Sequence, residues 1–271
     1  MRSTCTKDLP WLLAFACLTA FTLPQPSHAT SFDTSLTIEN EVDLELVLAV
    51  DISQSMDPDE QKIQREGYIA ALTSEEVVAA IQYGPIGRIA ITYMEWGGKS
   101  EQFIVADWSI IEDEKSAYVF ANTIAEAPLR RVQRTSISSA LAAAAQLIET
   151  NQFAGMRRVI DLSGDGPNNQ GGAVTKARDF AVSRGITING LPLILKEESI
   201  SWQSMLHLDH YYEDCVIGGP GAFAIPVRSK EAFADSIRMK LVLEIADLAK
   251  EKSTLVQVSE PREPISCSLF N

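Results

Sequence analysis

Apolar positions form short, almost uninterrupted runs that alternate with segments of helical periodicity. The clearest run covers 42–50 and has polar residues only near its start, which is typical of a strand in a sheet covered on both faces. Further strands are predicted at 88–95, 102–108, 158–163 and 186–195. Helices are predicted at 57–72, 74–81, 112–125, 136–150, 172–183, 201–208 and 229–250. This order predicts an α/β fold, namely a Rossmann-like, doubly wound, mostly parallel sheet with one antiparallel edge strand and helices on both faces.

The first residues have the pattern of an export signal. Arg2 and Lys7 precede an apolar stretch at 11–23, and Ser27-His28-Ala29 has the small-x-small form of a cleavage site. The apolar stretch is short for a membrane span, and later segments offer no other, so we expect no stable membrane insertion. Lipidation at Cys17 stays open as an alternative. We therefore expect a periplasmic or secreted protein, cleaved near Ala29.

The remaining chain divides into three parts. A polar, flexible leader is expected at 30–41, a single large domain at 42–250 and an irregular tail at 251–271. Two cysteines, Cys215 and Cys267, remain after removal of the signal, and in an oxidising compartment an even pair predicts a disulfide that ties the tail to the domain.

The charge balance restricts the partners. The chain carries a formal net charge of −13 at pH 7. A surface of this sign repels phosphate backbones and anionic lipid, so nucleic acid and anionic membranes are poor partners.

Oxygen-bearing side chains stand at three predicted loops. Asp51, Ser53 and Ser55 follow the strand 42–50, Thr135 precedes an alanine-rich helix, and Asp165 follows a buried strand. Three such positions at strand-to-helix junctions of one sheet are expected to converge at its carboxyl edge. Oxygen-only ligands favour a hard divalent cation, Mg2+ first, with Mn2+ and Ca2+ as alternatives.

Each of these positions also has a simpler interpretation. Thr135 or Ser136 is a suitable helix N-cap, and Asp165 with Gly166 a suitable turn. Asp51 could cap the next helix, although Asp57 before a proline is better placed for that. The joint occurrence of all three loops favours the cation site.

Four further residues are weaker candidates. Glu95 ends a strand next to the first one and is a candidate outer-shell carboxylate, although a solvated strand end is the favoured interpretation. Asp57 is a second candidate, although helix capping suffices to explain it. His207 and His210 have a spacing that could chelate a transition metal on a helix, but a surface helix end is the favoured interpretation.

Taken together, Asp51-x-Ser53-x-Ser55, Thr135 and Asp165 resemble the metal-ion-dependent adhesion site of von Willebrand factor A-type domains. The resemblance covers about 42–250 and is closest to a group of exported bacterial proteins with such a domain. It implies a Rossmann-like domain that binds a partner through the metal, with a partner Asp or Glu carboxylate in the open coordination position. One departure is Gly164, which stands where that family often has threonine.

The predicted function is accordingly an exported, metal-dependent protein-interaction module of the adhesion type, and not an enzyme. The alternative is a metal-dependent hydrolase of phosphate esters. Neither a nucleophile motif nor a catalytic base accompanies the oxygen cluster, and the loop at 164–171 lacks the lysine of a phosphate-binding loop. A solute-binding role is disfavoured because the chain offers one domain without a second lobe.

Overall fold

The computed structural model describes residues 40–195, 207–247 and 262–270. The predicted signal peptide, almost all of the predicted leader and most of the predicted helix at 201–208 lie outside the described residues. Within the described part, no helix is both long enough and apolar enough to cross a bilayer.

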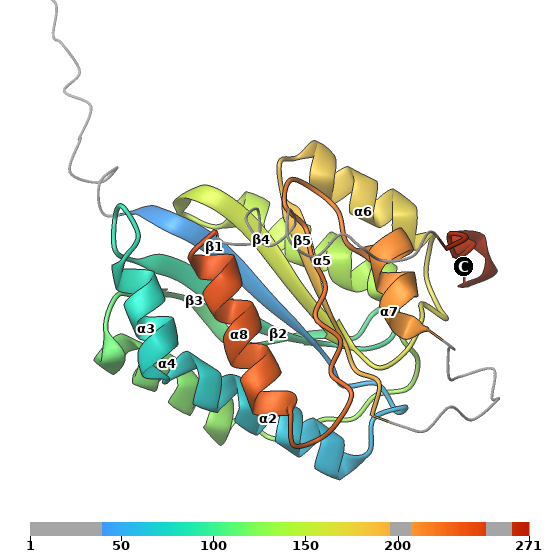
Figure 1. Ribbon diagram of the computed structural model, residues 1–271, viewed down its shortest axis with the longest axis horizontal. Helices are drawn as coiled ribbons and strands as arrows, with labels where there is room; N and C mark the ends of the chain where they lie inside the picture. The colour runs from blue at the N-terminus through green and yellow to red at the C-terminus, as the bar shows by residue number, and fades with distance from the viewer. Residues whose placement is uncertain (1–39, 196–206, 248–261, 271) are drawn as a thin grey trace, which may run out of the picture.

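A five-stranded sheet forms the centre of the molecule (Figure 1). Its strands are β1 (Glu41–Asp51), β2 (Ile89–Trp96), β3 (Gln102–Ile111), β4 (Ala154–Gly164) and β5 (Thr187–Pro192). They lie in the order β3-β2-β1-β4-β5; only β3 runs antiparallel to its neighbour. The mostly parallel sheet with one antiparallel edge is confirmed, and β1 is buried on both faces as its apolar run predicts.

Helices cover both faces of this sheet. The helical segments are α2 (Pro58–Leu72), α3 (Glu75–Gln82), α4 (Glu114–Glu126), α5 (Ile137–Thr150), α6 (Val174–Ser183), α7 (Leu208–Tyr211), the π-helix η1 (Tyr212–Val216), α8 (Phe233–Ile245) and the 3-10 turn η2 (Cys267–Phe270). In Figure 1, α2, α3, α4 and α8 lie together on one side and α5, α6 and α7 on the other. Two apolar cores result, one under each helical layer.

Local sequence signals fix several helix ends. Asp57 caps α2 in a capping box with Glu60, and Ser74 caps α3, as predicted. Several boundaries differ from prediction. The last helix begins at Phe233 and not at Ser229, and β4 already begins at Ala154. β5 ends at Pro192, whose register partner Gly164 is the last residue of β4.

A charged cluster lies buried between β4 and α8. The ammonium group of Lys240 is 2.6 Å from Asp161 and also contacts Glu244, and all three side chains are almost fully enclosed. Asn189 donates a 2.9 Å hydrogen bond to Glu244. Burial, together with the Asp161 carboxylate, raises the pKa of Glu244 to about 7, and the lysine opposes this shift.

The predicted disulfide joins Cys215 in η1 to Cys267 near the C-terminus. Around it, Arg262 pairs with Asp214 at 2.6 Å, and the N–H of Ile265 donates to the same carboxylate at 2.8 Å. The segment that carries Cys267 is therefore held against η1 by one covalent bond and a small polar cluster.

Removing this disulfide is expected to lower the free energy of unfolding. The bond closes a loop with a sequence separation of 52, for which the chain-entropy model gives about 4 kcal/mol. Cys267→Ser should therefore lose about 2–4 kcal/mol in urea unfolding. Dithiothreitol should lower the stability of the wild type similarly and leave the variant unchanged; equal stability of oxidised wild type and variant would contradict the expectation.

Candidate functional site

The site begins where β1 ends and the chain turns into loop one (52–57). Asp51 is fully buried, and its Oδ1 accepts a 2.7 Å hydrogen bond from the N–H of Ser53. Behind the turn, α2 supplies two glutamine amides: Gln64 donates to the Asp51 carbonyl at 3.2 Å and Gln61 to the Ile52 carbonyl at 3.1 Å. The glutamines thus fix the turn through its backbone carbonyls and do not engage the hydroxyls of Ser53 and Ser55.

A chain of short contacts connects loop one to loop three (165–173). Ser53 Oγ and Ser55 Oγ are 2.8 Å apart, and Ser55 Oγ donates to Asp165 Oδ1 at 2.5 Å. Together with the bond to Asp51, this places four of the five predicted side chains in one continuous cluster.

Loop two (127–136) lies against loop one. Ser53 and Val132 form a parallel β-bridge. The guanidinium group of Arg131 donates to the carbonyl oxygens of Gln54 at 2.6 Å and Met56 at 3.0 Å. The prediction that Thr135 lies at a strand-to-helix junction is wrong, because loop two connects two helices, α4 and α5. Loop two reaches the sheet edge through its bridge to Ser53.

Thr135 is buried at the junction of loops two and three. Its N–H donates to Asn169 Oδ1 at 2.9 Å, and its carbonyl accepts from the Asn169 N–H at 2.8 Å. The N-cap residue of α5, Ser136, makes no side-chain cap bond; instead Asn168 accepts from the N–H of Ser138 at 3.1 Å. The capping interpretation of Thr135 and Ser136 is therefore wrong, because a residue of loop three caps α5.

Sequence reasoning missed the part played by Asn168 and Asn169. It identified a glycine- and asparagine-rich loop, but nothing in a single sequence says which backbone groups the two amides will reach. Asparagine side chains in turns hydrogen-bond nearby backbone, so the asparagine pair itself was the available signal.

The electrostatics of the cluster are those of an unbalanced negative charge. Burial raises the pKa of Asp51 well above its ordinary value, the Asp165 carboxylate adds to the shift, and hydrogen bonds from Ser53 oppose it. Within the described part of the chain, Asp51 Oδ2 is enclosed and accepts no hydrogen bond of normal geometry. Such an oxygen is costly to bury unless a positive group balances it.

A divalent cation would supply that balance. The cluster offers the carboxylates of Asp51 and Asp165 and the hydroxyls of Ser53 and Ser55, and Thr135 lies at the adjoining junction of loops two and three. This is an oxygen-only set of the type that Mg2+, Mn2+ and Ca2+ prefer. The donor set and the uncompensated Asp51 oxygen therefore fit a cation held by the five predicted residues Asp51, Ser53, Ser55, Thr135 and Asp165.

Gly164, the departure noted in the sequence, has a steric cause. A Cβ atom at this position would lie 2.8 Å from the Tyr212 hydroxyl, 3.0 Å from Asp51 Oδ2 and 3.3 Å from Trp96. The space that a side chain at 164 would need is thus already taken by Tyr212.

The two candidate outer-shell carboxylates are engaged elsewhere. Glu95 pairs with Arg65 and lies 3.9 Å from Arg130. Its neighbour in the register is Val50 and not Asp51, so the carboxylate lies on the α2 face of the sheet. The arrangement does not support an outer-shell role for Glu95.

Asp57 serves as the cap of α2 and lies 3.8 Å from Lys230. Capping is sufficient to explain the position of Asp57, and its role as an outer-shell carboxylate of the cation site stays a prediction.

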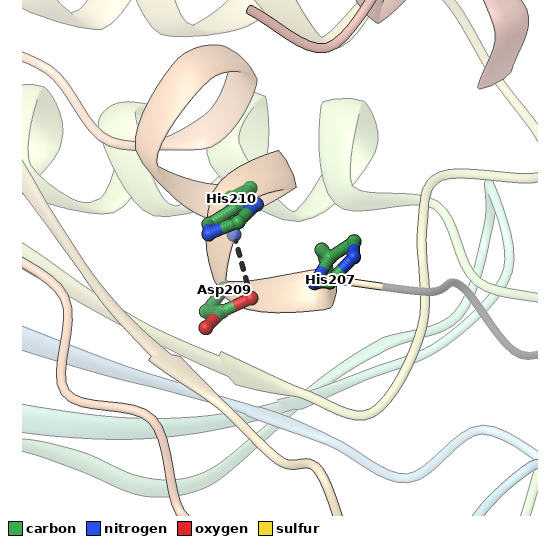
Figure 2. Close-up of side chains that lie close together, drawn as sticks. All are labelled: His207, Asp209 and His210. Atoms are coloured by element: carbon green, nitrogen blue, oxygen red, sulfur yellow. Dashed lines mark hydrogen bonds between the residues drawn. The ribbon is translucent and has the colours of Figure 1, made fainter. Parts of the chain in front are cut away.

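His210 lies in α7, and His207 directly precedes this helix (Figure 2). The ligand atoms of His207, Asp209 and His210 fall within 4.8 Å of one another, and the two rings are stacked. However, Arg228 donates to Asp209 Oδ2 at 2.5 Å, and the N–H of His210 donates to Oδ1 at 2.9 Å. The arginine already neutralises the carboxylate, which agrees with the favoured interpretation of a surface helix end.

Solved structures define the class of fold. The chain resembles proximal thread matrix protein 1 from the mussel byssus, with a TM-score of 0.55 and 12% identity over 77% of this chain and 48% of that one. It also resembles the pilus adhesin SpaC from Lactobacillus rhamnosus GG, with a TM-score of 0.54 and 14% identity over 78% and 30%. A third match is a von Willebrand factor type A protein from Catenulispora acidiphila, with a TM-score of 0.54 and 13% identity over 76% and 43%. The protein therefore has a von Willebrand A-like α/β fold.

Within that class, the chain belongs to the family described as "Protein of unknown function (DUF1194)", whose model matches residues 41–249. It spans less than half the length of each of the three solved chains. A second structure of the mussel protein is described as having a zinc-occupied MIDAS motif, that is, a metal-ion-dependent adhesion site. No curated protein sequence matches the chain.

Proposed function

We propose that this protein is an exported, non-enzymatic interaction module that binds an acidic group of a partner protein through a divalent cation, Mg2+ first. The observation that carries the proposal is the buried carboxylate of Asp51, whose Oδ2 accepts no hydrogen bond of normal geometry, in one cluster with the side chains of Ser53, Ser55 and Asp165. A cation there balances the charge of Asp51 and Asp165.

The roles of the residues follow from their chemistry. The hydroxyls of Ser53, Ser55 and Thr135 are neutral ligands, whereas Asp51 and Asp165 supply charge directly or through bound water. A site that leaves one cation position to water can accept a partner carboxylate by displacing that water.

Two further observations support the proposal. The fold matches a pilus adhesin and a byssus matrix protein, and the latter is described with a metal in its adhesion site. The disulfide between Cys215 and Cys267 is typical of a protein outside the cytoplasm and supports a periplasmic or secreted location.

The direct test is calorimetric titration of the mature chain, after treatment with EDTA, with Mg2+ and Mn2+. Ser55→Ala removes one hydroxyl of the cluster and should lower the affinity at least about 10-fold, the range seen when groups around a metal are removed. Ser183→Ala is the matched control, because among the described residues the Ser183 hydroxyl donates only to the Phe180 carbonyl of its own helix. Absence of binding by the wild type, or equal affinity in Ser55→Ala, would overturn the cation site.

The partner and the alternative activity are tested on the same protein. Capture of extracytoplasmic proteins that requires Mg2+, is reversed by EDTA and is lost in Ser55→Ala is the expected result. Turnover of a phosphate monoester that is lost in the same variant would instead favour the hydrolase.

A further inference from the structure

Tyr212 lies at the cation site although it is far from the other site residues in the sequence. It is the first residue of η1, and its side chain is fully buried in the core under α5 and α6. Its hydroxyl approaches the end of β4, where Gly164 leaves room for it.

Two glycines on adjacent strands clear a slot for this side chain. A Cβ atom at Gly164 in β4 would lie 2.8 Å from the Tyr212 hydroxyl, and one at Gly190 in β5 would lie 2.6 Å from the ring carbon Cδ1. Both distances are too short for real side chains, so any larger residue at either position would displace the tyrosine. The sheet is thus shaped around Tyr212 at the point where the strands end.

The hydroxyl of Tyr212 and the second oxygen of Asp51 lack partners in the same place. Both atoms are enclosed and, among the described residues, neither makes a hydrogen bond of normal geometry. The missing Cβ of Gly164 would lie 2.8 Å from one and 3.0 Å from the other, so their separation cannot exceed the sum of these distances. An upper bound of this size is within reach of one bridging water that makes a hydrogen bond of about 2.8 Å to each oxygen. A buried phenol normally has a hydrogen-bond partner.

We propose that Tyr212 is a positioning residue of the cation site, whose hydroxyl holds the Asp51 carboxylate across this gap through one bridging water. The phenol O–H donates to the water, and the water donates to Asp51 Oδ2. This link fixes the orientation of the carboxylate toward the site. This assignment rests on the proposed function.

The decisive variant is Tyr212→Phe, which keeps the ring in its slot and removes only the hydroxyl. Calorimetry should show a loss of Mg2+ affinity of about 10-fold, as for other groups that orient metal ligands. Tyr93→Phe is the matched control: Tyr93 is equally buried but lies in the core on the α2 side of the sheet. It should bind Mg2+ as the wild type does.

A purely structural role is separated by two further readouts. The Mg2+-induced rise in Tm is measured in each variant from its own metal-free value, so a general loss of stability does not count. Mg2+ should also perturb the near-ultraviolet spectrum of the wild type through the buried phenol, and this signal should be smaller in Tyr212→Phe.

Rescue provides the final arm. In the Tyr212→Phe background the shortest contact of a Cβ at Gly164 is removed, although Asp51 and Trp96 stay close. Gly164→Ser then places a new hydroxyl near Asp51, and the double variant should recover part of the lost affinity. Wild-type affinity in Tyr212→Phe would overturn the assignment while leaving the proposed function intact. Failure of the wild type to bind Mg2+ would overturn both.

Discussion

Asp51→Asn is expected to abolish Mg2+ binding and, at the same time, to stabilise the metal-free protein. The carboxylate supplies charge to the cation, so its loss should reduce the affinity by at least about 100-fold, the upper range for groups around a metal. Without the cation, the same carboxylate is buried beside Asp165 and one of its oxygens is uncompensated. Neutralising it should raise the free energy of unfolding by about 1–2 kcal/mol.

The gain in stability should depend on pH. Because the pKa of Asp51 is raised by burial and by Asp165, the folded metal-free protein holds a proton that the unfolded chain has already released. This contribution to stability is complete below the unfolded value, about 3.9, and is lost as pH rises through the folded pKa. The advantage of Asp51→Asn should therefore grow as pH rises.

Urea unfolding in EDTA at several pH values measures this difference. Asp59→Asn is the matched control, because Asp59 is exposed in the first turn of α2. An Asp51→Asn variant that binds Mg2+ normally, or that is less stable than the wild type at every pH, would contradict the expected result.

Lys240→Met is expected to cause a large loss of stability. Methionine fills the space of the lysine chain, but it leaves Asp161 and Glu244 buried without their common cation. Breaking a buried ion pair by removing one partner typically costs about 3–5 kcal/mol. Lys62→Met, which removes an exposed lysine paired with Glu66, should change stability by less than about 1 kcal/mol.

The loss in Lys240→Met should be smaller at low pH. The pKa of Glu244 is already raised to about 7 in the presence of the lysine, and burial raises that of Asp161 as well. Without Lys240 both acids take up protons more readily in the folded state. Stability is therefore retained at low pH and lost as pH rises from the unfolded values, about 4, toward the raised folded values.

Urea unfolding should be measured at pH 5 and pH 8, which lie about two units below and one unit above the pKa of Glu244 in the wild type. Most of the loss of stability in Lys240→Met should appear at the higher pH. Folding of the variant at pH 5 but not at pH 8 would agree with this account. An equal loss at both pH values would contradict it.

Much of the fold can be predicted from short-range sequence patterns. The apolar run ending at Asp51 predicts a central strand, and Asp57 and Ser74 mark helix starts at the observed positions. The antiparallel edge follows from the spacing between β2 and β3. Each of these signals acts within a few residues, so a single sequence contains it completely.

The candidate site was harder to predict in full. The serines and Asp165 come together as expected, but the support of Thr135 by Asn169 depends on how two distant loops meet. Tyr212 was not predicted as part of the site for the same reason. The sequence shows only a glycine at 164, and it does not show which distant side chain lies beside that glycine.

The buried charged residues were also not predicted. A lysine in a helix normally faces solvent, and the burial of Lys240 becomes apparent only from its contact with Asp161 in β4. Glu95 ends a strand next to β1, but the face to which it points depends on a register of one residue, which no pattern in β2 specifies.

The bonds that join the three loops have a consequence for ion selectivity. The three loops of the site are joined by hydrogen bonds between backbone groups and the side chains of Arg131, Asn168 and Asn169. These bonds do not use the five predicted ligand side chains, so the loops form a preformed cage around the cation position. A preformed cage cannot widen at little cost, whereas Ca2+ requires longer bonds and a larger, more adaptable set of oxygens than Mg2+. Discrimination between the two ions would then reside in the stiffness of residues that touch neither of them.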